Sequence, residues 1–219
     1  MSYITKNHWN EFYKKQKGLN ENSTFSMFVF EKIKANKSNY ILVDIGCGTG
    51  KDSFYFASKG MKVIGIDGSE EVIKINKGKV NPLNYVDFKC VDLSDENEVN
   101  QLFEFVNEIA QLENKHVLIY NRFFLHAIPD EVEEVIFTGI NINLKKPYII
   151  MSEFRTKEDE MLHKIYNDHF RRYVDTNELL NRVLRFNWSV EFLMKERGLS
   201  IYKDEDPFLA RLILSKNNC

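Results

Sequence analysis

Cysteine is scarce in this 219-residue chain, which has three copies of it and only four prolines. Cys47, Cys90 and Cys219 are odd in number and widely spaced, so they indicate neither a disulfide framework nor a zinc site. The prolines are scattered, and no Pro-rich or Gly/Ser-rich linker, repeat or low-complexity block divides the chain. We therefore expect no metal and no second domain.

The chain also has almost no net charge and no apolar segment long enough to span a membrane. Its 30 basic and 32 acidic residues give a formal net charge of -2, which offers no electrostatic reason to expect nucleic acid as a partner. The beginning of the chain shows no signal-peptide pattern. We expect a cytoplasmic protein, monomeric or homodimeric, that acts on a small molecule.

Residues 41–50 carry the strongest positive signal. Residues 41–45 form a short apolar run typical of a buried strand, and residues 51–58 read as the following helix. Gly46, Gly48 and Gly50 occupy the turn between them. Glycine tolerates positive φ and lets a ligand approach the backbone, so this turn predicts a nucleotide-binding loop.

The spacing of the glycines separates two classes of cofactor. A dinucleotide fold uses G-x-G-x-x-G, which needs its third glycine at position 51, where this chain has Lys51. The pattern D-I-G-C-G-T-G from Asp44 to Gly50 instead resembles the first motif of the class I S-adenosylmethionine (SAM) methyltransferases. The resemblance implies that Asp44, Gly46, Gly48 and Gly50 hold the methionine end of SAM. We expect Cys47, Thr49 and Asp52 to be further cofactor-binding residues.

Two further apolar segments end in acidic residues. Residues 61–67 end in Asp67, about 20 residues past the glycine turn, where α/β nucleotide sites place a carboxylate on the ribose. We expect Gly68 and Ser69 to line the cofactor beside it. By resemblance to the family, Asp92 and Leu93 flank the adenine. Each acid has an alternative reading as a helix N-cap or turn residue.

The order of elements predicts an α/β fold. Expected strands near residues 41, 62 and 86 alternate with helices near 51, 69 and 96, which is typical of a parallel sheet with helices on both faces. Further strands are expected at 116–120, 148–154, 189–196 and 208–215, with helices at 129–143 and 176–185. This plan resembles the class I methyltransferases: a Rossmann-like, doubly wound, seven-stranded sheet, mostly parallel with an antiparallel last strand. We expect residues 1–219 to form a single domain, with a helical lid over 1–36 and the SAM-binding core over 37–219.

Arginine is absent before position 122, and lysine supplies all earlier positive charge. Arginine binds a carboxylate or phosphate through the paired N–H donors of its planar guanidinium group, so the use of arginine after this position can indicate an anion-binding site. Composition bias explains the pattern equally well. Arg122 and Arg155 follow the fourth and fifth expected strands, where an acceptor binds in an open α/β sheet. His169, Arg171, Arg172 and Tyr173 form a further candidate acceptor-binding run. We expect plain helix-face or strand-end charges at Arg182, Arg185, Arg197 and Arg211.

The segment after the fourth strand contains the candidate catalytic groups. By resemblance, Asn121 faces the methyl group of SAM, and Arg122 and His126 share a face if this segment is helical. His126 reads either as a hydrogen-bonded histidine at the edge of the pocket or as a general base for an alcohol acceptor. A phosphate, phosphonate or carboxylate arrives ionised and needs only binding and alignment.

The N-terminal aromatics suggest cover for the site, with Tyr13 reaching the acceptor, but they also fit simple packing on the sheet edge. Together the motifs resemble a bacterial branch that methylates small anionic metabolites in capsule, surface-polysaccharide, phosphonate or phosphoramidate chemistry. The chain lacks the D/N-P-P-Y turn of DNA amino-methyltransferases after its fourth strand. We therefore predict a SAM-dependent O-methyltransferase of a small anionic acceptor. The alternatives are N-methylation of a small metabolite, a nicotinamide oxidoreductase and a SAM-binding regulator without catalysis.

Overall fold

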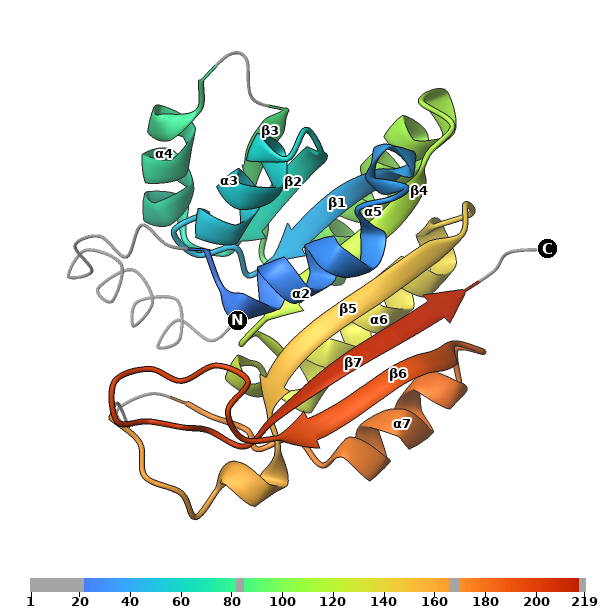
Figure 1. The fold of residues 1–219 in the computed structure, drawn as a ribbon. Coiled ribbons are helices and arrows are strands. Elements are labelled where there is room, and N and C mark those ends of the chain that lie inside the picture. Colours follow the sequence, from blue (N-terminus) through green and yellow to red (C-terminus); the bar gives the residue numbers. More distant parts are fainter. Residues whose placement is uncertain (1–21, 82–84, 166–169, 217–219) are drawn as a thin grey trace.

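The computed structural model describes residues 22–81, 85–165 and 170–216, in which strands and helices alternate along the chain (Figure 1). The strands are β1 (Tyr40–Ile45), β2 (Lys62–Asp67), β3 (Val86–Cys90), β4 (His116–Arg122), β5 (Tyr148–Arg155), β6 (Ser189–Glu196) and β7 (Leu209–Lys216). The helices are α2 (Thr24–Ile33), α3 (Lys51–Ser58), α4 (Glu70–Lys79), α5 (Glu96–Leu112), α6 (Asp130–Asn143) and α7 (Thr176–Leu184).

The strands form one seven-stranded sheet in the order β3-β2-β1-β4-β5-β7-β6. Neighbouring strands from β3 to β5 pair in parallel, whereas β7 is antiparallel to both β5 and β6. This confirms the predicted Rossmann-like sheet with its antiparallel last strand. The carboxyl ends of β1 to β5 consequently meet at one edge of the sheet, which we call the carboxyl edge.

Helices cover both faces of the sheet (Figure 1). Alternate residues of a strand point to opposite faces, so Val43 and Ile45 pack with α5, α6 and α7, whereas Leu42 and Tyr120 pack with α2 and α3. Both faces of the central strands are therefore buried. All six residues of β1 are buried, as expected for a parallel strand with helices on each side.

Helix α2 belongs to the hydrophobic core. Ser23 caps its first turn by accepting a hydrogen bond from the Ser26 N–H at 3.0 Å, and Phe25 and Val29 are fully buried. The Phe25 ring stacks on Tyr120 with 5.1 Å between centroids. The alternative reading, in which the N-terminal aromatics pack on the sheet, therefore holds for Phe25. Tyr13 and the rest of residues 1–21 lie outside the described part of the chain.

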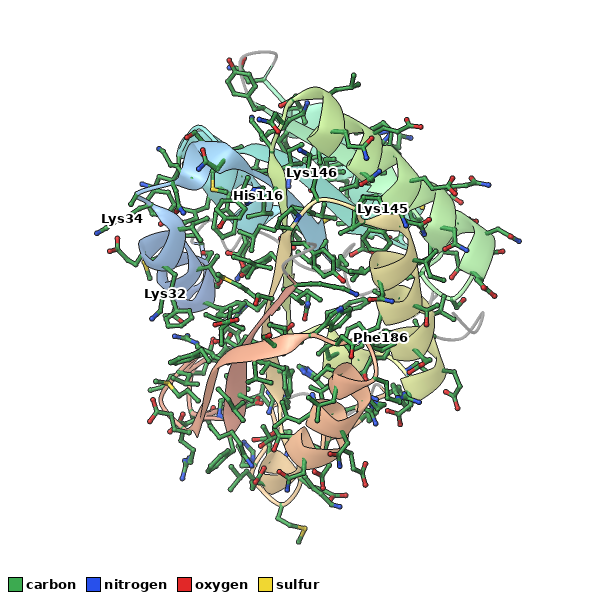
Figure 2. The ribbon with its side chains drawn as sticks, turned by 90° about the vertical axis from the view of Figure 1, so that its right-hand side faces the viewer. Lys32, Lys34, His116, Lys145, Lys146 and Phe186 are labelled. Carbon is green, nitrogen blue, oxygen red and sulfur yellow. The ribbon has the colours of Figure 1, made fainter. Side chains whose placement is uncertain are left out.

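Figure 2 turns the fold by 90° and labels residues far from the carboxyl edge. His116 begins β4, and Lys145 and Lys146 lie two or three residues before β5, so these three residues mark the opposite, amino edge. The predicted site residues Asp44, Asp67 and Arg122 lie at or next to the other end of their strands. Among the described residues, no helix has both the length and the hydrophobicity that crossing a bilayer requires.

Candidate active site

The glycine turn between β1 and α3 has the left-handed backbone that its sequence predicts. Gly46, Gly48 and Gly50 have φ values of +72°, +52° and +74°. A Cβ added to Gly46 would lie 2.5 Å from Cδ2 of Phe124, and one added to Gly50 would lie 3.0 Å from Cζ of Phe88. Both conformation and space therefore require glycine at position 46.

Neighbouring elements hold this turn in place. The Gly46 and Cys47 N–H groups donate to the Ile66 carbonyl at 2.8 and 2.9 Å, and the Gly48 N–H donates to Asp67 Oδ2 at 3.0 Å. On the other side, the buried Asn76 amide donates to the Gly48 carbonyl at 2.7 Å. The sequence reading missed Asn76, whose only signal was a polar residue on the inward face of α4. The loop is thus preorganised before any ligand binds.

We expect Gly46→Ala to lower the free energy of unfolding by more than Gly60→Ala does. Both glycines have positive φ, so both variants incur about 1–2 kcal/mol of backbone strain, but nothing lies within 4 Å of a Cβ at Gly60. Gly46→Ala must in addition displace the Phe124 ring. Urea denaturation of the two variants measures the difference, and equal losses would show that Phe124 moves aside without cost.

The acids at the ends of β2 and β3 are oriented by backbone donors. Asp67 is buried, and its Oδ1 accepts the Ser69 N–H at 2.9 Å while Oδ2 accepts that of Gly48. Gly68 lies between Asp67 and Ser69, and Ser69 caps α4 by accepting the Val72 N–H. Asp92 Oδ1 accepts hydrogen bonds from both the N–H and the hydroxyl of Ser94. Asp92 therefore stabilises the turn after β3, as its alternative reading as a turn residue predicts. Leu93 beside it is buried.

Asp44, the acid of the glycine motif, lies inside the protein. It is 3 % exposed and accepts a hydrogen bond from the Ser53 hydroxyl at 2.5 Å. Burial raises the pKa of Asp44 to about 8; the Ser53 bond lowers it, and the nearby Asp52 and Asp67 carboxylates raise it further. Asp44 is therefore protonated at neutral pH in the ligand-free protein. A cationic ligand at this position would favour its ionised form.

This raised pKa predicts how stability changes with pH. Unfolded Asp44 ionises near its ordinary pKa, whereas folded Asp44 keeps its proton until about pH 8, so its contribution to stability falls as pH rises between these values. An asparagine side chain cannot ionise, so the stability of Asp44→Asn relative to the wild type should increase by about 2 kcal/mol from about pH 6 to about pH 8. Urea denaturation at both pH values measures this, and parallel pH profiles would contradict a protonated Asp44.

Asp52, which the sequence predicts to contact the cofactor, also accepts hydrogen bonds from within the protein. Its Oδ1 accepts the Ser23 N–H, and its Oδ2 accepts the hydroxyls of Ser23 and Tyr120, at 2.7 to 2.8 Å. This buried carboxylate thereby joins the start of α2 to α3 and β4. Three protein donors satisfy Asp52, so we assign it to the framework of the site.

A second buried carboxylate organises the carboxyl ends of β4 and β5. Glu153 is fully buried and accepts from Arg122 Nε at 3.1 Å and Arg211 Nε at 2.8 Å. Burial raises the pKa of Glu153, and the two guanidinium groups oppose that rise. Arg122 also donates to the Ser200 hydroxyl at 2.7 Å. Arg211, expected to be a plain strand-end charge, is instead buried in this network, which contains one more cation than anion.

Replacing Glu153 by glutamine should be costly, because it leaves the buried Arg211 guanidinium and the half-buried Arg122 guanidinium without a counter-charge. We expect Glu153→Gln to lower the free energy of unfolding by about 3 kcal/mol. Glu134 pairs with Arg185 at a similar 2.8 Å, but both side chains are exposed, so Glu134→Gln should change stability by about 0.5 kcal/mol or less. Chemical denaturation of both variants provides the test, and losses of equal size would show that the buried triad adds nothing.

Phe123 lies at the centre of the predicted acceptor residues in a strained conformation. Its φ is +56°, which is rare for a bulky residue and is characteristic of functional sites. The guanidinium carbons of Arg122 and Arg155 lie 4.1 and 5.9 Å from the centroid of its ring. The His126 ring is 5.5 Å away in an edge-on arrangement. The sequence reading treated Phe123 only as core or pocket wall, because strain leaves no trace in composition.

His126 is placed differently from the prediction. β4 extends to Arg122, and only residues Leu125–Ala127 form a 3-10 turn, so Arg122 and His126 do not share a helical face. The buried His126 ring accepts the Arg155 N–H at Nδ1 at 3.1 Å. Neutral His126 therefore carries its proton on Nε2.

Arg155 and Arg172 bind the protein's own carboxylates. The buried Arg155 donates to Asp159 Oδ2 at 2.7 Å and pairs with Glu205, and these bonds tie together the segments that follow β5 and β6. Arg172 donates to the Leu125 carbonyl at 3.0 Å and pairs with Glu133 and Asp130 of α6. Burial and the nearby Arg182 lower the pKa of Arg172 to about 10.

The predicted acceptor residues consequently form two sets. Arg122 remains at the carboxyl edge, whereas the guanidinium groups of Arg155 and Arg172 anchor loops. The backbone N–H of Arg172 donates to the His126 carbonyl at 2.8 Å, which places Arg171 and Tyr173 on the segment that packs against His126. Tyr13 and His169 lie outside the described residues.

Asn121, expected beside the methyl group, is buried and donates to the Ser152 hydroxyl at 2.9 Å, while its Oδ1 accepts no hydrogen bond within the described chain.

Comparison with known proteins agrees with this geometry. Residues 36–187 match a family model described as a methyltransferase domain, and the chain belongs to this family. An uncharacterised protein of Methanocaldococcus jannaschii is 26% identical over 70% of this chain and 78% of its own length. A protein of Invertebrate iridescent virus 6, whose name marks it as a proposed methyltransferase, is 26% identical over 83% of this chain and 65% of its own length.

Solved structures share the fold. A SAM-dependent methyltransferase from Anabaena variabilis superposes with a TM-score of 0.75 and 17% identity over 99% of this chain and 96% of its own. Magnesium protoporphyrin IX methyltransferase from Synechocystis, solved with bound S-adenosylhomocysteine (SAH), gives a TM-score of 0.62 and 13% identity over 99% and 97% of the two chains. The chain is therefore a member of a methyltransferase family, and the solved proteins that share its fold include one with bound SAM.

Proposed function

We propose that the protein transfers the methyl group of SAM to an oxygen atom of a small anionic acceptor. The observation that carries this proposal is the buried network of Arg122, Glu153 and Arg211, which leaves one positive charge in excess where β4 and β5 end. An anionic ligand would balance that charge. In an open α/β sheet, ligands bind outside the carboxyl ends of the strands, which is where Arg122 lies.

The residues at this edge fit the cofactor. When bound, SAM supplies a methyl group on a positively charged sulfur. We assign the preorganised turn of Gly46, Gly48 and Gly50 to its methionine end, with Cys47 and Thr49 between them and Asp44 nearby. Asp67 would bind the ribose, and Asp92 with Leu93 the adenine. The unused acceptor position of Asn121, a buried Oδ1, supports its assignment beside the cofactor.

An anionic acceptor needs no general base, and the geometry of His126 favours such an acceptor. Nδ1 of His126 already accepts the Arg155 N–H, and Nε2 carries the proton of the neutral ring, so no nitrogen is free to take a proton from an alcohol. A phosphate, phosphonate, phosphoramidate or carboxylate oxygen arrives ionised. Arg122 would then hold the acceptor, while Phe123 and His126 would shape the pocket and exclude water.

The first acceptors to test are phosphorylated, phosphonylated and carboxylated sugars and metabolites, including intermediates of surface-polysaccharide synthesis. Purified protein is incubated with SAM and each compound, and methylated products are identified by mass spectrometry. Methyl esters formed on the ionised oxygens of these compounds are the expected result. Products methylated on nitrogen from neutral amines would contradict the proposal, while leaving SAM-dependent methyl transfer intact.

We expect Arg122→Lys to lower kcat/KM for the acceptor by about tenfold to a hundredfold, because lysine cannot keep both the Glu153 contact and a planar donor for the acceptor. SAH affinity, measured by calorimetry, should change less than about twofold. Arg185→Lys is the matched control, because Arg185 is exposed and pairs with Glu134 on the outside of α6. A parallel loss of SAH affinity and turnover would instead give Arg122 a structural role.

A further inference from the structure

Lys51 is the residue that breaks the dinucleotide pattern, and the fold brings it to the carboxyl edge beside Arg122. Lys51 is the first residue of α3, and the next residue, Asp52, accepts the Tyr120 hydroxyl at 2.7 Å. Tyr120 and Arg122 lie two residues apart on β4 and so point to the same face of the sheet. The first turn of α3 therefore packs over the end of β4, where both Lys51 and Arg122 emerge.

Within the described residues, neither side chain has a hydrogen-bond acceptor for every one of its donors. Lys51 is half-buried, yet across the described ranges it donates no hydrogen bond and forms no ion pair. Arg122 donates through Nε to Glu153 and through Nη2 to Ser200, while its Nη1 donates to no described residue. Asp52, the carboxylate next in sequence to Lys51, already accepts three hydrogen bonds.

The electrostatics agree with this proximity. Burial lowers the pKa of Lys51, the Arg122 guanidinium lowers it further, and Asp52 partly opposes both effects. A lysine that served only solubility would extend into water and keep its hydration. Lys51 instead loses hydration beside another cation, which is unfavourable unless an anion completes the arrangement.

We propose that Lys51 and Arg122 together bind one anionic oxygen group of a ligand at the carboxyl edge. This inference rests on the proposed function and deepens it, because it adds Lys51 to the binding residues. Two sources offer the same chemistry: the methionyl carboxylate of the cofactor and the anionic group of the acceptor. Glu153 and Arg211 fix the Arg122 side of the pair, and the glycine turn fixes the Lys51 side.

The test compares Lys51→Met with Lys51→Arg and with Lys79→Met, which removes an exposed helical lysine at the end of α4 remote from the carboxyl edge. Calorimetry measures the binding of SAM and of decarboxylated SAM, which lacks only the carboxylate. Inorganic phosphate is then titrated into the SAH-saturated protein at constant ionic strength, and the melting temperature reports its binding.

If Lys51 binds the cofactor carboxylate, Lys51→Met should weaken SAM by about tenfold and leave decarboxylated SAM unchanged. If Lys51 binds the acceptor, both cofactors should bind as in the wild type, while the saturable effect of phosphate is lost. In either case Lys51→Arg should restore most of the effect and Lys79→Met should show none. Unchanged binding of all three ligands, or equal losses for SAM and decarboxylated SAM, would overturn the proposal.

These outcomes separate the anion site from the proposed reaction. The comparison of the two cofactors and the phosphate titration require no methyl transfer. A charge-dependent effect of Lys51 without any O-methylated product would retain the anion site and remove only the proposed acceptor chemistry. Conversely, O-methylation of anionic acceptors that Lys51→Met leaves unchanged would retain the reaction and remove Lys51 from the site.

Discussion

The buried contact of Glu153 with Arg122 and Arg211 is the interaction on which the acceptor side of this molecule depends. Removing a carboxylate and two guanidinium groups from water is costly, and their arrangement repays that cost only when every contact forms. Glu153 and Arg122 are register partners on β5 and β4, and Arg211 is the register partner of Glu153 on β7. The antiparallel insertion of β7 therefore brings the second arginine to the carboxyl edge.

The network extends from the sheet into the surrounding segments. Arg211 also donates to the Leu199 carbonyl at 3.0 Å and to the Thr24 hydroxyl at 3.2 Å, and Thr24 itself donates to Leu199 at 2.6 Å. The start of α2 and the segment after β6 are thereby fixed to Arg211, which shares the carboxylate of Glu153 with Arg122. Asp52 performs the parallel task nearer the cofactor loop, where it joins α2 to α3 and β4. Two buried carboxylates thus position the two halves of the site.

The sequence predicted those features that depend on local physical rules. The three glycines, the helix over 51–58 and the acids at strand ends follow from backbone sterics and periodicity within a few residues, and the structure shows each of these elements in place. Arg211 could not be predicted in the same way, because its partner Glu153 is 58 residues away in the sequence. The condition under which Arg122 and His126 would share a helical face is not met, because β4 continues through Arg122 and Phe123 then turns the chain with a positive φ.

The change from lysine to arginine after position 121 now has a physical explanation, although a different one from direct substrate binding. Arg155, Arg172 and Arg211 all bind buried carboxylates of the protein, and in these places the planar fork of arginine satisfies an acid that lysine would satisfy less completely. Arginine is therefore used here to bind buried carboxylates and to fix the segments that carry them. Arg122 differs from these three arginines in two ways. Its guanidinium group lies over the Phe123 ring, and its Nη1 donates no hydrogen bond to a described residue. Lys51 begins α3 near the same edge, and under our proposal the charge of the ligand is the partner of both Lys51 and Arg122.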